Sequence, residues 1–172
     1  PKEYYDTEDK RTAVQDFVLR LFAGEVQNYS FQAKGSGKSG LLSVSRCGQE
    51  ILERTACVLN PSDGSLVVNM EIGFPANGRT IASQELIRIL FDFLPGCVEK
   101  SLFYRALDPK ACANVAYLCE DQQAIRSALK EKGLTAFIAD GSILPRETGV
   151  SDLPMKHAVP FVSPESLRVT LD

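Results

Sequence analysis

The sequence has one histidine, no tryptophan and no long hydrophobic run. A lone histidine, His157, leaves a metal site without companion imidazoles, and no segment around it resembles a nucleophile elbow. No run approaches the ~20 apolar residues that cross a bilayer, so we expect no membrane contact. The first residues, PKEYYDTEDK, are acidic, whereas a secretory signal is basic and then apolar. These features argue against a metal centre, a histidine-dependent hydrolase and a membrane protein.

The sequence has few cysteines, and their spacing matches no paired motif. Their number is five, and no two of them form the C-x-x-C pair of a zinc or redox site. We therefore expect free thiols in a reducing intracellular compartment. The cysteines are Cys47, Cys57, Cys97, Cys112 and Cys119.

Neither sign of charge dominates, because 19 basic residues face 22 acidic ones, a net charge of −3. This balance excludes an extensive basic coat for nucleic acid, but it is compatible with a local basic site. A length of 172 residues with 44% hydrophobic residues is typical of one ordinary globular domain or two small ones. We expect a single domain over 1–172, since no repeat or low-complexity tract divides it.

Helical spacing of apolar residues predicts about four helices. The first covers 8–28, and a second begins at Ser83 as its cap and ends where Pro95-Gly96 interrupts it. Asp108-Pro109 is typical of a helix start. A further helix is expected to begin near Glu120-Asp121, with acidic residues at its start, and to stop before Gly133.

Apolar alternation predicts strands between and after these helices. The segments 50–59 and 65–74 flank an Asn-Pro-Ser-Asp-Gly turn and predict a hairpin, and LTAFIA at 134–139 reads as a short buried strand. Helices and strands come in blocks, so we predict an α+β fold in which a mixed or antiparallel sheet with a hairpin packs on the helices. Residues 140–164 contain four prolines and predict an extended loop. The other expected strands are 41–46 and 166–171.

The segment GSGKSG is the first candidate for chemistry. Small residues let main-chain N–H groups approach a phosphate, while Lys38 supplies charge and Ser39 can ligate magnesium. The segment fails the Walker pattern G-x-x-x-x-G-K-[ST], because Gln32 stands where the first glycine is required and a strand follows instead of a helix. A flexible basic loop and a glycine-rich anion nest both remain open interpretations. Its candidate contact residues are Gly35, Ser36, Gly37, Lys38, Ser39 and Gly40.

Three polar residues after this loop extend the candidate surface. Arg46, Gln49 and Arg54 lie in the run SRCGQEILERT, where they can contact phosphate, nucleotide or RNA, or simply form a solvated charged strand face. Arg146 follows Pro145, which stiffens the backbone and can present a guanidinium to an anion. A salt bridge between domains explains Arg146 equally well.

Long runs of the sequence resemble a known family. The runs GSGKSGLLSVSRCGQEILERTA, LCEDQQAIRSALKEKGLTAFIADGSILPRETGVSDLPM and AVPFVSPESLRVTL are similar to the N-terminal part of the predicted ATPases of the ABC class. The resemblance runs from about Asp9 to the end, and FIADGSILPRETGVSDLP is its most specific part. It departs at Cys47, where many relatives have proline.

The resemblance implies an accessory N-terminal domain of a longer ATPase, which continues into a P-loop domain and uses ATP and Mg²⁺ there. The resemblance implies that three segments face the nucleotide site or a substrate channel and contact the ligand there. They are GSGKSG, the R-x-G-Q-E element at 46–50 and the LPR-x-[ST]-G element at 144–149. The implied partners are the remaining ATPase domain and a second copy of the parent. A branch that acts in mitochondrial RNA editing adds RNA as a partner and the mitochondrion, besides the cytoplasm, as a location. An RNA- or partner-binding module and a structural scaffold are the alternative functions.

Overall fold

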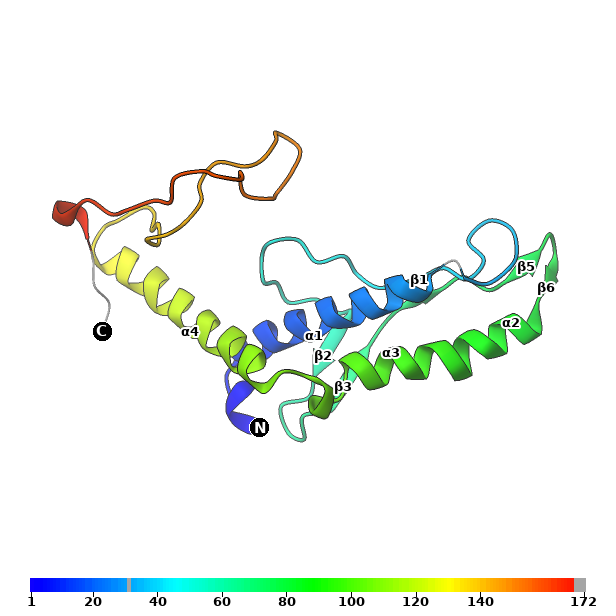
Figure 1. Ribbon diagram of the computed structural model, residues 1–172. Helices are drawn as coiled ribbons and strands as arrows, with labels where there is room; N and C mark the ends of the chain where they lie inside the picture. Colours follow the sequence, from blue (N-terminus) through cyan, green and yellow to red (C-terminus); the bar gives the residue numbers. More distant parts are fainter. Residues whose placement is uncertain (31, 169–172) are drawn as a thin grey trace. The chain divides into compact units, whose positions relative to one another are not determined.

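The computed structural model describes residues 1–30 and 32–168 (Figure 1). Within this range the chain forms four α-helices and six short strands, which confirms the α+β fold class. The helices are α1 (Glu8–Tyr29), α2 (Ser83–Arg88), α3 (Leu94–Ser101) and α4 (Pro109–Glu131). The strands are β1 (Leu42–Ser43), β2 (Cys57–Leu59), β3 (Leu66–Val68), β4 (Glu71–Ile72), β5 (Ala76–Asn77) and β6 (Thr80–Ile81).

The chain divides into two compact units, residues 1–120 and residues 121–172. Helix α4 begins in the first unit and ends in the second. Unit 1 contains all six strands and the other three α-helices. Each unit has its own candidate residues, and we describe them separately.

Helix α1 organises the core of unit 1. Its start is fixed by Thr7, whose side chain accepts a hydrogen bond from the Lys10 main-chain N–H at 3.3 Å. The helical spacing seen in the sequence places one stripe of side chains in the interior, which confirms the predicted helix. Val14 and Val18 pack with Leu59 and with the first turns of α4, while Phe22 packs with residues of β1 and α3.

The six strands form three antiparallel pairs, two of which share the extended stretch of residues 66–72, while β5 pairs with β6. Strand β3 pairs with β2 and strand β4 pairs with β1, which confirms the predicted hairpin across residues 60–65. The strand expected at 50–59 is wrong in its first half, because only Cys57–Leu59 pairs. Residues 46–54 instead form a loop that is tied to α1 by side chains, as the next subsection shows.

The expected break at Pro95 does not occur. A π-helical turn, Ile89–Phe93, joins α2 to α3, and the Leu94 N–H donates to the Ile89 carbonyl. Proline removes an N–H and crowds the preceding turn, and the wider π turn just before Pro95 accommodates that loss. Ser83 is the first residue of α2 rather than its cap, since the cap is Ala82 and no side chain bonds there.

Helix α4 is one continuous helix where two were expected. Asp108 caps it as predicted, accepting from the Lys110 N–H at 2.9 Å, and Gly133 ends it with φ of 65°. Glu120 is therefore in the middle of the helix and not at a start. It pairs with the buried ammonium of Lys10 at 3.1 Å, so its role is an ion pair rather than a dipole interaction.

Unit 2 is mostly extended chain without regular strands. The segment 134–139 is not the expected buried strand, because Leu134, Phe137 and Ile138 are exposed and no described strand pairs with it. Residues 140–164 form an irregular loop with one bridge, between Arg146 and Pro154. The strand expected at 166–171 falls partly outside the described residues, and 166–168 are not strand.

The structure also bears on the cysteines and on membrane-spanning helices. All five cysteines are free thiols, as predicted, and four of them are buried. Among the described residues, no helix combines the length and apolarity needed to cross a membrane.

Candidate functional site

The GSGKSG segment is an ordered loop between α1 and β1. The Ser36 N–H and hydroxyl donate to the Ala76 carbonyl of β5 at 2.9 and 3.2 Å. The buried Ser39 hydroxyl donates to the Ser36 carbonyl at 2.7 Å and accepts from the Ala76 N–H at 3.1 Å. These bonds hold the loop against β5 in the described structure.

Glycine is required in this loop for close packing. Gly40 has φ of 69°, and a Cβ there would lie 2.7 Å from the Cβ of Ala33. Its N–H donates to the Gly73 carbonyl at 3.0 Å. The N–H groups of Ser36, Ser39 and Gly40 thus point at carbonyls of the chain itself. The exposed Lys38 side chain supplies the positive charge of this loop.

A basic residue that the sequence analysis missed lies on the neighbouring hairpin. Strands β5 and β6 are joined by a tight two-residue turn, Gly78-Arg79, whose Arg79 is exposed. A glycine at the first position of a two-residue turn is a hairpin signal that would have identified this element. Because Ser36 and Ser39 bond to Ala76 of β5, the loop and this hairpin belong to one end of unit 1 (Figure 1).

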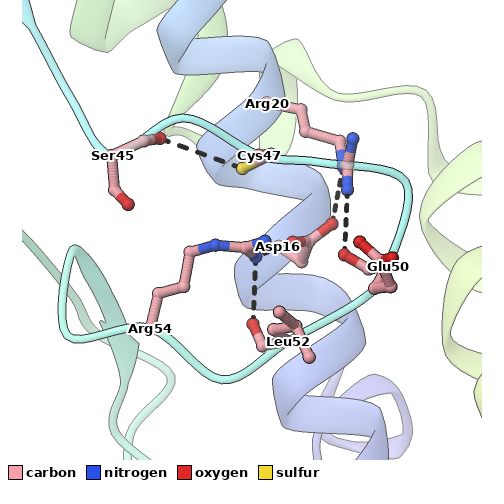
Figure 2. A network of polar contacts seen from close by, with 7 residues as sticks. All are labelled: Asp16, Arg20, Ser45, Cys47, Glu50, Leu52 and Arg54. Atoms are coloured by element: carbon pink, nitrogen blue, oxygen red, sulfur yellow. Dashed lines mark hydrogen bonds and ion pairs between the residues drawn. The ribbon is translucent and has the colours of Figure 1, made fainter. Parts of the chain in front are cut away.

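Arg54 is held by a buried carboxylate of α1. The Asp16 side chain is 2% exposed, and it accepts from Arg54 and, at 2.6 Å, from Arg20 (Figure 2). Arg54 also donates to the Leu52 carbonyl at 3.1 Å, and Arg20 to the Glu50 carbonyl at 3.3 Å. This network of three charged side chains fixes the loop 46–54 on α1, and it gives Arg54 a structural role that the sequence did not indicate.

The other two candidates in this loop, Arg46 and Gln49, are exposed. Between them Cys47 is half-buried, with its Sγ 4.0 Å from the Ser45 carbonyl. Burial and the charge of Asp16 raise the pKa of the Cys47 thiol, while the two arginines of the network lower it less. Cys47 is therefore a protonated thiol at neutral pH and not an activated nucleophile.

Arg146 lies in unit 2, on a turn closed by main-chain bonds. The Glu147 N–H donates to the Leu153 carbonyl at 2.9 Å, and the Met155 N–H to the Pro145 carbonyl at 2.8 Å. The exposed Arg146 guanidinium pairs with Asp152 of the same turn at 3.9 Å. This ion pair lies within the turn, and a salt bridge between domains at Arg146 stays a prediction.

Comparison with known families agrees with the resemblance described above. The model of the N-terminal region of ATPases of the ABC class matches residues 1–105, more than half of the chain. The chain belongs to the ABC-class ATPase family. In this ABC-class ATPase a second model, that of the P-loop domain, matches residues 108–172, so α4 and unit 2 correspond to P-loop domain sequence. No curated protein matches the chain.

The family implies a nucleotide and Mg²⁺ as cofactors of the P-loop domain. The described residues of this ABC-class ATPase do not fit these groups. No three acidic, histidine or cysteine side chains among them form a metal-binding cluster. In GSGKSG, the N–H groups of Ser36, Ser39 and Gly40 bond to carbonyls of the chain. We therefore assign no step of hydrolysis to these residues.

Proposed function

We propose that this chain includes the accessory N-terminal region of an ABC-class ATP-binding and ATP-hydrolysing protein. We propose further that the GSGKSG loop of this region presents Lys38 to phosphate groups in the nucleotide site or a substrate channel. The observation that carries the proposal is the attachment of the loop to β5. Ser36 and Ser39 bond to Ala76 while the Lys38 side chain points to solvent, and no ion pair joins Lys38 to another described residue.

A fixed loop favours this role for physical reasons. Ordering a flexible loop on binding costs free energy, and a loop that is already ordered avoids that cost. Lys34 and Arg79 are exposed and lie on the loop and on the hairpin to which it bonds. Together with Lys38 they supply positive charge in a chain whose net charge is −3. Such a group complements a polyphosphate held elsewhere.

The turn at 144–149 is proposed to act in the same way. Main-chain bonds shape this turn, and its exposed pair, Arg146 and Asp152, can exchange partners at little cost because exposed ion pairs are weak. The exposed apolar side chains of 134–138 support packing of unit 2 against the rest of the ATPase domain. Both contacts belong to the proposal, as does assembly of the parent protein into a homodimer.

The test is ATP turnover by the complete ATPase that includes the P-loop domain. We expect Lys38→Ala and Arg146→Ala each to lower kcat/KM by ~10-fold, the effect of losing one charged contact to a phosphate. Lys110→Ala is the matched control, because Lys110 is an exposed lysine at the start of α4 and belongs to neither loop. Unchanged turnover in both test variants would remove these side chains from the nucleotide site and leave a scaffold role.

A second candidate function is RNA binding through the basic face formed by Lys34, Lys38 and Arg46. Exposure of all three side chains favours it. Binding to phosphate backbones weakens steeply as salt rises, and reversal of the charges at Lys34 and Lys38 would lower affinity for every RNA sequence alike. Retention of RNA by the doubly reversed variant at the same salt concentration would refute this candidate.

A further inference from the structure

Unit 1 contains an open groove of about 690 Å³ between α1 and residues 42–47. The helix contributes the stretch from Arg20 to Gln27, and the other wall consists of β1 and the extended chain that follows it, up to Cys47. The groove lies beside the Asp16 network, since Arg20 and Cys47 belong to both (Figure 2). None of the GSGKSG residues lines it.

The charge around the groove is positive. Both charged residues that line it, Arg20 and Arg46, are basic. Asp16 is one carboxylate shared by Arg20 and Arg54, so the network itself carries an excess positive charge. Arg20 donates to the main-chain carbonyl of Glu50, and this contact adds no negative charge to the network. An anion in the groove would therefore meet the guanidinium of Arg46 and that of Arg20, whose charge Asp16 partly neutralises.

The rest of the groove is lined by small side chains, hydroxyl groups and one amide. Ala23, Gly24 and Gln27 form the helix side, and Ser43 and Ser45 lie opposite. A Cβ added at Gly24 would meet nothing within 4 Å, so the groove has open space above this glycine. The volume of the groove lies within the ~300–1,000 Å³ that is typical of small-molecule sites.

We propose that this groove binds a small organic phosphate, with its phosphate group on Arg20 and Arg46 and its planar body over Ala23 and Gly24. The inference goes beyond the proposed function, because it concerns different residues and requires no P-loop. Guanidinium groups form paired hydrogen bonds with phosphate oxygens, and the bonds of Arg20 to Asp16 and Glu50 hold its side chain in place for that contact.

Cys47 supplies a direct readout on the unchanged 172-residue chain. Its half-buried thiol lines the groove, whereas the other four cysteines are buried and serve as internal controls. We would measure alkylation of each cysteine by mass spectrometry at one fixed pH, with AMP, adenosine or inorganic phosphate as probes. We expect AMP to slow alkylation of Cys47 in a saturable way and to leave the other cysteines unchanged. Adenosine should protect at least ~10-fold less well at equal concentration, because it lacks the charged contacts.

Two variants with matched controls place the binding in the groove. Gly24→Leu fills the open space without a clash, and Gly96→Leu is its control, since Gly96 is also helical with nothing within 4 Å of an added Cβ. Arg46→Gln removes one guanidinium, and exposed Arg126→Gln on α4 is its control. We expect each groove variant to raise the Kd for AMP by ~10-fold or more and each control to leave it unchanged. Calorimetry gives these Kd values without relying on Cys47.

Three results would overturn the inference. The first is that both groove variants bind AMP as tightly as the unchanged chain. The second is that adenosine binds as tightly as AMP. The third is that millimolar AMP neither slows alkylation of Cys47 nor gives a heat of binding in calorimetry. None of them bears on the proposed function, whose test is turnover in the P-loop-containing protein. If Lys38→Ala lowers turnover while AMP fails to bind the groove, the proposed function is retained and the groove proposal is rejected.

Discussion

Replacement of Asp16 by asparagine is the sharpest test of how unit 1 is held together. The substitution keeps the size of the side chain but removes the charge that Arg20 and Arg54 share. Arg54 is 13% exposed and would remain as a buried cation without its counter-ion, whereas Arg20, at 38% exposed, is largely compensated by water. Breaking a buried ion pair costs ~3–5 kcal/mol, and an exposed pair contributes at most ~1 kcal/mol.

We therefore expect Asp16→Asn to lower the free energy of unfolding by ~3 kcal/mol, near the lower limit because asparagine still accepts a hydrogen bond. With a urea dependence of ~1–3 kcal/mol per molar, the unfolding midpoint would fall by ~1–3 M. Urea titrations followed by circular dichroism and by tyrosine fluorescence would measure it and check that the two probes agree. Asp92→Asn is the control, because Asp92 is exposed in the same unit.

The double variant Asp16→Asn with Arg54→Met separates the charge from the packing. It removes the orphan cation along with the carboxylate, so we expect it to be more stable than Asp16→Asn alone. A free energy of unfolding for Asp16→Asn within ~0.5 kcal/mol of that of the Asp92→Asn control would refute the reasoning. So would a double variant whose loss equals the sum of the two single losses, because that result would mean that the charges do not interact.

Two further predictions concern a glycine and a buried thiol. Gly73→Ala would press a Cβ onto the main-chain carbonyl of Lys38, so we expect a loss of ~1–3 kcal/mol in thermal unfolding. Gly96→Ala, in open helix, should gain up to ~1 kcal/mol, and equal Tm values for the two variants would contradict the packing described here. Burial raises the pKa of Cys57 from 9.0 to about 11, so its proton is retained longer in the folded chain. The stability that the protonated Cys57 thiol contributes is therefore present below pH 9 and declines between pH 9 and 11. Urea titrations at stepped pH would measure this decline, and Cys57→Ala should flatten it. If the free energy of unfolding falls equally with pH in the variant, the assignment to Cys57 is wrong.

Local signals in the sequence were sufficient for the ends of the long helices. The apolar spacing identified α1, Asp108-Pro109 marked the start of α4, and Gly133 marked its end. Each of these signals acts between residues a few positions apart, so no knowledge of the remaining fold is needed. The same local rules failed at Pro95 and Glu120. A π turn relieves the proline, and Lys10, which lies far away in the sequence, pairs with the glutamate.

The sequence by itself determined the α+β class, the ABC-class resemblance, the free thiols and the candidate residues. Only the tertiary structure decided what those residues do. Ser39 bonds to Ala76, 37 positions away, and Arg54 to Asp16, 38 positions away. The groove beside Arg46 exists because α1 and β1 face each other. Such contacts depend on how elements pack, and a single sequence carries no periodicity or spacing rule that links residues so far apart.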